Sequence, residues 1–130
     1  MTIESRSPFD WRRRIKSFAY AFEGGWYVLQ TQHNTWIHAA VSIFVIALAF
    51  WLRISRLEWS VLILTMMIVW MAEFFNTALE ALVDAAQPEF HPLAKVAKDV
   101  AAAAVLVGAI GAVIVGLLIM GPPLWERLFQ

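Results

Sequence analysis

Three stretches of this 130-residue chain are long and apolar enough to cross a bilayer, and they limit the folds open to it. They cover residues 35–52, 59–83 and 100–121 in a sequence that is 61% hydrophobic and 15% charged. About 20 residues of helix cross the hydrocarbon core, where every backbone polar group must be bonded within its own segment. The sequence therefore predicts an all-α membrane protein with three transmembrane helices.

The basic residues are distributed unevenly about these spans. Seven Lys and Arg residues lie before the first span or between the second and third, and three lie on the opposite side. The positive-inside rule then places the N-terminus and the loop 84–99 in the cytoplasm. Gly121-Pro122-Pro123 is expected to end the third helix, because proline lacks the amide donor that continues a helix.

The segment before the first span has the pattern of an amphipathic helix. Apolar residues recur at close to helical spacing, at Trp11, Ile15, Phe18, Phe22, Trp26 and Leu29. This predicts a surface helix over 9–31 on the cytoplasmic leaflet, either a simple interfacial anchor or a part of the site. The whole chain, 1–130, is then a single membrane domain: the surface helix, spans 35–52 and 59–83, and a helix 93–121 that contains the third span.

The second span carries a polar stripe. Glu73, Asn76, Glu80 and Asp84 are three or four residues apart, so they share one helix face that runs from the lipid to the cytoplasmic edge. A carboxylate near the bilayer centre costs about 2.5–3.5 kcal/mol on insertion scales, which makes such residues candidates for function. The alternative is that Glu73 and Asn76 form an interhelical hydrogen-bond pair that only specifies packing.

A second polar cluster opens the third helix. Lys95, Lys98 and Asp99 share a face at the cytoplasmic depth of Glu80 and Asp84. A salt-bridged helical hairpin would explain them without any function. Carboxylate and amide oxygens also suit Mg²⁺, however, and lysine suits phosphate, so this combination favours phosphoryl transfer.

Other functions are excluded by what the sequence lacks. There is no Cys, which excludes thiol catalysis and thiolate metal sites. Ten basic residues balance ten acidic ones, so a nucleic-acid partner is not expected. A small-residue face in the third span, at Ala104, Gly108, Ala112 and Gly116, predicts close helix packing rather than a phosphate loop.

Two long motifs resemble those of the small bacterial diacylglycerol kinase and undecaprenol kinase family. They are Glu73-Phe-Phe-Asn76-Thr-Ala-Leu-Glu80-Ala-Leu-Val-Asp84 and His91-Pro-Leu-Ala-Lys95-Val-Ala-Lys98-Asp99. The resemblance implies a homotrimer in the bacterial plasma membrane with cytoplasmic sites between protomers. Its activity would be transfer of the γ-phosphoryl group of MgATP to a lipid hydroxyl, that of diacylglycerol or undecaprenol.

The resemblance also implies roles for individual residues. Glu73 matches the catalytic base and Asn76 a neighbour that positions the reacting groups. Glu80 and Gln32 match the positions that hold Mg²⁺. The positions that match nucleotide contacts are Arg13, Tyr20, Gln32, Glu80, Glu89, His91, Lys98 and Asp99.

Gln32 departs from the family pattern, in which a glutamate often stands just before the first span. An amide offers a neutral oxygen and hence weaker binding of Mg²⁺. Two alternatives therefore stay open: a relative that binds nucleotide or lipid without turnover, and a proton-coupled carrier, since intramembrane carboxylates also form relays. The Asn34-x-x-Ile37-His38 segment resembles the undecaprenol kinase branch, but an apolar lipid pocket tolerates differently shaped tails.

Overall fold

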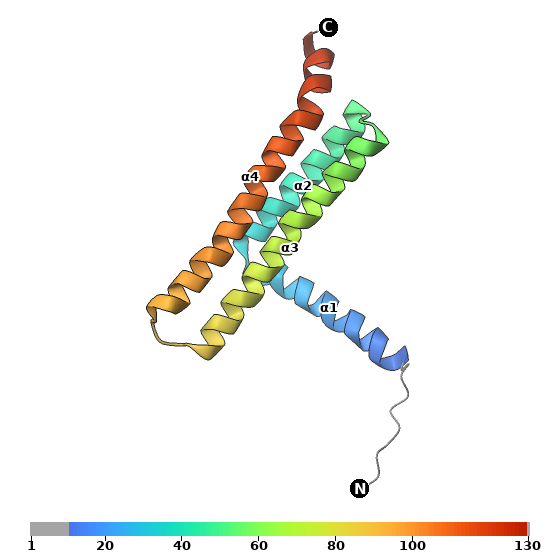
Figure 1. Cartoon of the computed structure of the whole chain (residues 1–130). Helices are drawn as coiled ribbons and strands as arrows, with labels where there is room; N and C mark the ends of the chain where they lie inside the picture. Colours follow the sequence, from blue (N-terminus) through green and yellow to red (C-terminus); the bar gives the residue numbers. More distant parts are fainter. Residues whose placement is uncertain (1–10, 130) are drawn as a thin grey trace.

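A computed structural model describes residues 11–129, which form four helices and no strand. They are α1 (Trp11–Thr31), α2 (His33–Leu52), α3 (Arg56–Ala86) and α4 (Pro92–Phe129). Helices α2, α3 and α4 are each long and apolar enough to cross a membrane. In Figure 1, α3 and α4 form an antiparallel hairpin with α2 beside it, so the all-helical prediction with three candidate spans is confirmed.

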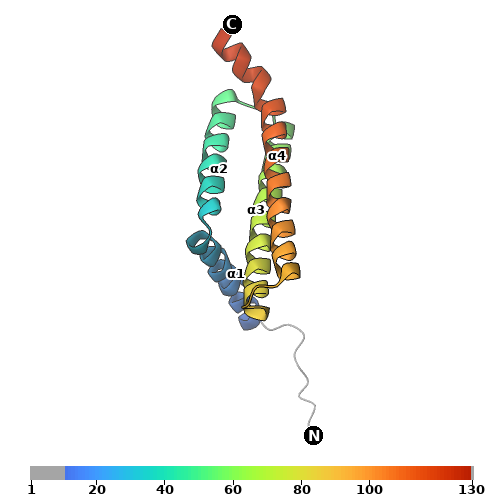
Figure 2. The ribbon, with the colours of Figure 1, turned by 90° about the vertical axis from the view of Figure 1, so that its left-hand side faces the viewer.

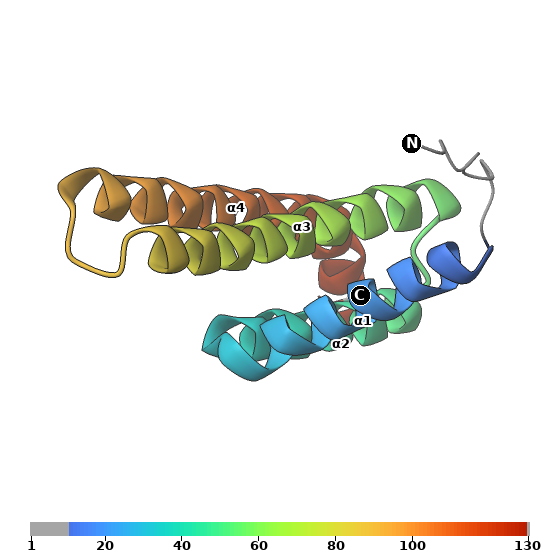
Figure 3. The same ribbon diagram turned by 90° about the horizontal axis from the view of Figure 1, so that it is seen from below.

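Helix α1 covers most of the predicted surface helix 9–31. Residues 9 and 10, and Arg6, which counted toward the predicted orientation, lie outside the described residues. Figure 1 shows α1 leaving the bundle at an angle, and Figure 3 shows it from below. Its large apolar side chains stay uncovered: Phe18 is 69% exposed and Phe22 is 78% exposed. The position of α1 on the membrane surface stays a prediction.

The turn between α2 and α3 is built from two capping motifs. Arg53 adopts the left-handed conformation (φ 54°), and the amides of Arg53 and Ile54 donate to the carbonyls of Phe50 and Ala49. These two bonds form a Schellman motif, whose left-handed position is usually glycine. Ser55 and Glu58 then form a capping box that begins α3. The turn is therefore short and well bonded.

The predicted end of the third helix at residue 121 is wrong. Helix α4 continues through Pro122 and Pro123 to Phe129, and Figure 2 shows that it changes direction near this end. Each proline removes one helical hydrogen bond and bends the helix, but it ends the helix only if nothing else holds the next turn. Here Met120 and Leu124, on either side of the prolines, pack into a cluster with residues of α2 and α3.

Helices α3 and α4 approach closely where the small-residue face predicts it. A Cβ atom added at Gly108 would lie 3.8 Å from Val69 Cγ2 and 3.9 Å from Val69 Cα. Figure 2 shows α2 standing further from the α3–α4 pair along much of its length. At one end of the bundle Ala49, Leu52 and Leu62 are buried together and join α2 to the pair.

Replacing Arg53 by Gly should stabilise the protein. Glycine adopts the left-handed conformation without the Cβ clash, so we expect a gain of about 1 kcal/mol, measured as a higher melting temperature in detergent micelles. Arg53→Ala is the matched control, because it removes the same charge but keeps the Cβ atom. Equal stabilisation by both variants would mean that loss of the charge, not backbone strain, is responsible.

Candidate active site

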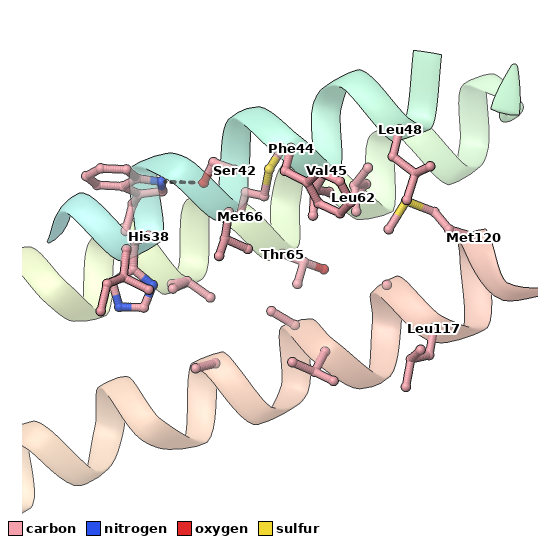
Figure 4. Close-up of a pocket in the computed structure, with 18 of the residues that line it drawn as sticks. His38, Ser42, Phe44, Val45, Leu48, Leu62, Thr65, Met66, Leu117 and Met120 are labelled. Carbon is pink, nitrogen blue, oxygen red and sulfur yellow. Dashed lines mark hydrogen bonds between the residues drawn. The ribbon is translucent and has the colours of Figure 1, made fainter. Parts of the chain in front are cut away.

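Helices α2 and α3 run antiparallel, and polar side chains bridge them in register. As the residue number rises along α2 it falls along α3: Gln32 meets Glu80, His38 meets Glu73, and Ser42 meets Trp70. The Trp70 indole donates to Ser42 Oγ at 3.2 Å, and this bond is the dashed line in Figure 4. The polar face of α3 is therefore matched by a polar face of α2.

Gln32 lies at the corner between α1 and α2, where the chain changes direction. It is extended (φ −106°, ψ 112°) and lies at the N-cap of α2, but its side chain makes no capping hydrogen bond. Its Nε2 instead donates to Glu80 Oε2 at 3.2 Å. The side chain that could have capped a helix thus ties the α1–α2 corner to α3.

The second oxygen of Glu80 is also bound by an amide. Asn76 Nδ2 donates to Glu80 Oε1 at 3.1 Å, one helical turn earlier on α3. The carbonyl oxygen of Asn76 is buried and has no hydrogen-bond partner among residues 11–129. A buried polar atom without a partner is costly, so this oxygen is a position where a bound ligand or cation would be stabilised.

Glu73 is almost completely buried, with 2% of its surface exposed. Thr35 Oγ1 donates to Glu73 Oε1 at 3.5 Å, and His38 Nε2 lies 3.7 Å from Glu73 Oε2. No role was predicted for Thr35, and His38 was noted only as part of a motif. The available signal was spacing, because Gln32, Thr35 and His38 recur every three residues and share a face of α2.

The lysines that open α4 pair with carboxylates at the same end of the bundle. Lys98 Nζ donates to Asp84 Oδ1 at 2.8 Å and so joins α4 to α3. Lys95 pairs with Asp99 on its own helix. Both pairs are largely open to solvent, so they contribute little to stability, and Lys98 and Asp99 remain accessible to a ligand.

Two candidate residues lie in the loop that precedes α4. His91 Nδ1 accepts a hydrogen bond from the Leu93 amide at 3.2 Å, which is an N-cap contact at the start of α4. The backbone carbonyl of Glu89 accepts from Gln87 Nε2 at 3.3 Å. The structure thus gives His91 a local structural role, and Glu89 is exposed at the same end of the bundle as Asp84 and Lys98.

The nucleotide contacts predicted on α1 are not brought to Glu80 within one chain. At the helical rise, Tyr20 lies roughly 18 Å and Arg13 roughly 28 Å along α1 from Gln32. Figure 1 shows α1 pointing away from the α3–α4 turn. The structure of one chain therefore groups Gln32, Asn76 and Glu80, with Glu73 beside them, but not the α1 residues.

An apolar cavity lies between α2, α3 and α4. Its volume is about 460 Å³, and small residues of α4 such as Ala112 and Gly116 leave room for it. Figure 4 shows His38 at one end and Leu117 and Met120 toward the other. Because His38 also approaches the carboxylate of Glu73, the cavity ends beside the polar site.

Comparison with known proteins identifies the family. The sequence model described as prokaryotic diacylglycerol kinase matches residues 19–120. The chain is 41% identical over 112 residues to the undecaprenol kinase of Bacillus subtilis, covering 86% of this chain and 91% of that protein. It is 46% identical over 111 residues to the diacylglycerol kinase of Synechocystis sp., covering 85% of this chain and 63% of that protein. It is also 33% identical over 109 residues to the diacylglycerol kinase of Escherichia coli K12, covering 78% and 84% of the two chains. The chain therefore belongs to the prokaryotic diacylglycerol kinase family.

Proposed function

We propose that this chain transfers the γ-phosphoryl group of MgATP to the hydroxyl of a membrane lipid, either diacylglycerol or undecaprenol. Its family makes it a lipid kinase, and its relatives carry both names. The observation that carries the proposal is the placement of Glu73, a buried carboxylate between an apolar cavity and the Gln32–Glu80–Asn76 cluster. A lipid hydroxyl and a nucleotide phosphate could meet at that position.

The reaction needs a base close to the lipid hydroxyl. The hydroxyl oxygen forms a bond to the γ-phosphorus, the bond from that phosphorus to the β–γ bridging oxygen breaks, and ADP leaves. Glu73 would take the proton that the hydroxyl loses. Because Glu73 is 2% exposed, water, the competing acceptor of the phosphoryl group, is kept from it.

The apolar cavity supports a lipid rather than a water-soluble acceptor. It lies between three helices that are each apolar enough to span a membrane, and it reaches the polar site at His38. A lipid tail lying in it would bring the attached hydroxyl toward Glu73. Apolar walls of this kind do not distinguish strongly between tails, so both lipids remain candidate substrates.

The residues around Glu80 fit Mg²⁺ in part. The unpartnered Asn76 Oδ1 and the carboxylate of Glu80 are hard oxygen ligands, and Gln32 would add a third if its amide turned over. Among the described residues there is no group of three His, Asp or Glu side chains able to hold a metal. Phosphate oxygens would therefore have to complete the coordination, and bound Mg²⁺ would neutralise charge on the β- and γ-phosphates.

The rest of the nucleotide site would come from α4, the loop and α1. Lys98 is suited to a phosphate because an ammonium is a compact positive charge, and Asp99, Glu89 and His91 lie at the same end of the bundle.

A homotrimer would supply the missing α1 contacts. Large apolar side chains are exposed along α2, α3 and α4, and lipid or further copies of the chain must cover them. In such an assembly Arg13 and Tyr20 would complete a site shared between neighbouring protomers. We place this assembly in the bacterial plasma membrane with its N-terminus and site in the cytoplasm, where ATP is available.

Glu73→Gln should abolish lipid phosphorylation. The amide cannot accept the proton, so we expect the rate to fall at least a hundredfold, about what a general base contributes. The assay follows labelled γ-phosphate from ATP, with Mg²⁺, into diacylglycerol or undecaprenol in mixed micelles. Glu58→Gln is the matched control, because Glu58 is a carboxylate at the opposite end of the same helix. Glutamine can also complete the capping box that Glu58 forms there, so this change should not disturb the start of α3. Full activity of Glu73→Gln would overturn the proposed base.

Gln32→Glu should strengthen Mg²⁺ binding. The added charge beside Glu80 should lower the half-saturating Mg²⁺ concentration roughly five- to tenfold, since one charge is worth about 1 kcal/mol or more to a nearby cation. Without Mg²⁺ the two carboxylates repel each other, so the melting temperature should fall and then recover when the ion is added. An unchanged Mg²⁺ dependence together with an unchanged melting temperature would exclude Gln32 from the metal site.

Lys98→Met should weaken ATP binding but not folding. We expect the KM for ATP to rise about tenfold, because a hydrogen bond from an ammonium to phosphate is lost. Asp84→Asn is the control, since it removes the ion-pair partner of Lys98 and keeps the ammonium. Equal increases of the KM for ATP in both variants would show that ATP binding depends on the ion pair between Lys98 and Asp84 rather than on contact of Lys98 with phosphate.

A further inference from the structure

We propose that Thr35 and His38 of α2 are positioning residues, which hold the carboxylate of Glu73 in place from the neighbouring helix. The inference rests on the proposed role of Glu73 as the base. Thr35 approaches one oxygen of that carboxylate and His38 approaches the other. They are three residues apart and therefore reach across from one face of α2.

Thr35 forms a different hydrogen bond from the other threonines that the structure describes. A hydroxyl within a helix commonly donates to the carbonyl four residues earlier. Thr31, Thr65 and Thr77 all do so, at 2.8, 2.8 and 3.0 Å. Thr35 instead donates across to Glu73 Oε1, at 3.5 Å.

The break in the helix at Gln32 explains the difference. Thr35 lies in the first turn of α2, and its own amide bonds to the carbonyl of Gln32. Because α1 and α2 point in different directions, the aligned carbonyl of a continuous helix is missing at this turn. The hydroxyl of Thr35 is completely buried, with 0% of the residue exposed, so it needs a partner, and Glu73 supplies one.

His38 constrains the other side of the carboxylate. Its Nε2 lies 3.7 Å from Glu73 Oε2, and its side chain is 19% exposed. His38 also lines the apolar cavity, as Figure 4 shows, so it stands where the cavity meets the base. With neighbours on both oxygens, the carboxylate plane of Glu73 is restricted from two directions.

This restriction matters because the glutamate side chain is flexible. A general base works only within hydrogen-bond reach of the proton it accepts, and small misplacements reduce the rate steeply. Loss of either contact should therefore lower kcat. Thr35 and His38 contact Glu73, whereas Lys98 contacts Asp84, so we expect the KM for ATP to stay unchanged.

The experiment compares Thr35→Val, which keeps the shape and removes the hydroxyl, with Thr35→Ser, which keeps the hydroxyl. His38→Met is compared in the same way with His38→Gln, which keeps an N–H donor. We expect kcat to fall about tenfold or more in Thr35→Val and His38→Met, and to be largely retained in the two conservative variants. Ser60→Ala is the control, because Ser60 is an exposed residue of α3 whose hydroxyl donates to the Arg56 carbonyl rather than to Glu73.

A double-mutant cycle separates positioning from a general loss of structure. If Thr35 acts through Glu73, then adding Thr35→Val to Glu73→Gln should cause no further loss of the residual rate. An additional tenfold loss would show an independent structural effect and overturn the inference. Thr35→Val could fail to fold, which its melting temperature would show. In that case the comparison of His38→Met with His38→Gln, together with a double-mutant cycle of His38→Met and Glu73→Gln, tests the inference.

Failure of this inference is distinguishable from failure of the proposed function. An active Glu73→Gln protein would remove the base and with it the proposed function. An inactive Glu73→Gln protein, with kcat unchanged in both Thr35→Val and His38→Met, would leave the base in place and overturn only the positioning role. Loss of activity in the serine and glutamine variants as well would point to packing at α2 and would also contradict the inference.

Discussion

The structure depends on how two carboxylates are accommodated within apolar helices. Glu73 and Glu80 are bound by a hydroxyl and two amides, and these donors are neutral. Neutral donors lower the cost of burial without cancelling the negative charge, which stays available to a proton or a cation. Two of the three donors are Thr35, in the first turn of α2, and Gln32, the residue just before α2, so satisfying the carboxylates also fixes the register between α2 and α3.

Packing differs along the length of the bundle. Helices α3 and α4 are brought close by small residues such as Gly108, whereas α2 joins them through the apolar cluster around Leu62 at one end and polar bonds near Glu73 at the other. The cavity lies between these two points of attachment. The same small residues that allow one close helix pair therefore leave space beside the third helix, and this space ends at the polar site.

The sequence predicts those features that depend on local pattern. Apolar stretches give the three spans, and helical spacing places Glu73, Asn76 and Glu80 on one face, because both signals lie within a single segment. The helix end predicted at residue 121 was wrong because packing of neighbouring side chains outweighs the local effect of proline. Thr35 was missed because its partner lies 38 residues away on another helix.

Gln32 shows how one side chain can serve the fold and also the proposed chemistry. A glutamate at this corner would repel Glu80 unless a cation lay between them, whereas the amide donates to Glu80 directly. The corner between α1 and α2 is thus tied to α3 by the amide itself. In the proposed metal-bound state the amide would turn its oxygen toward the ion, and the ion would replace the lost hydrogen bond as the link to Glu80. If the site holds Mg²⁺ as proposed, the amide makes the arrangement of the helices less dependent on the ion, at the cost of weaker attraction for it.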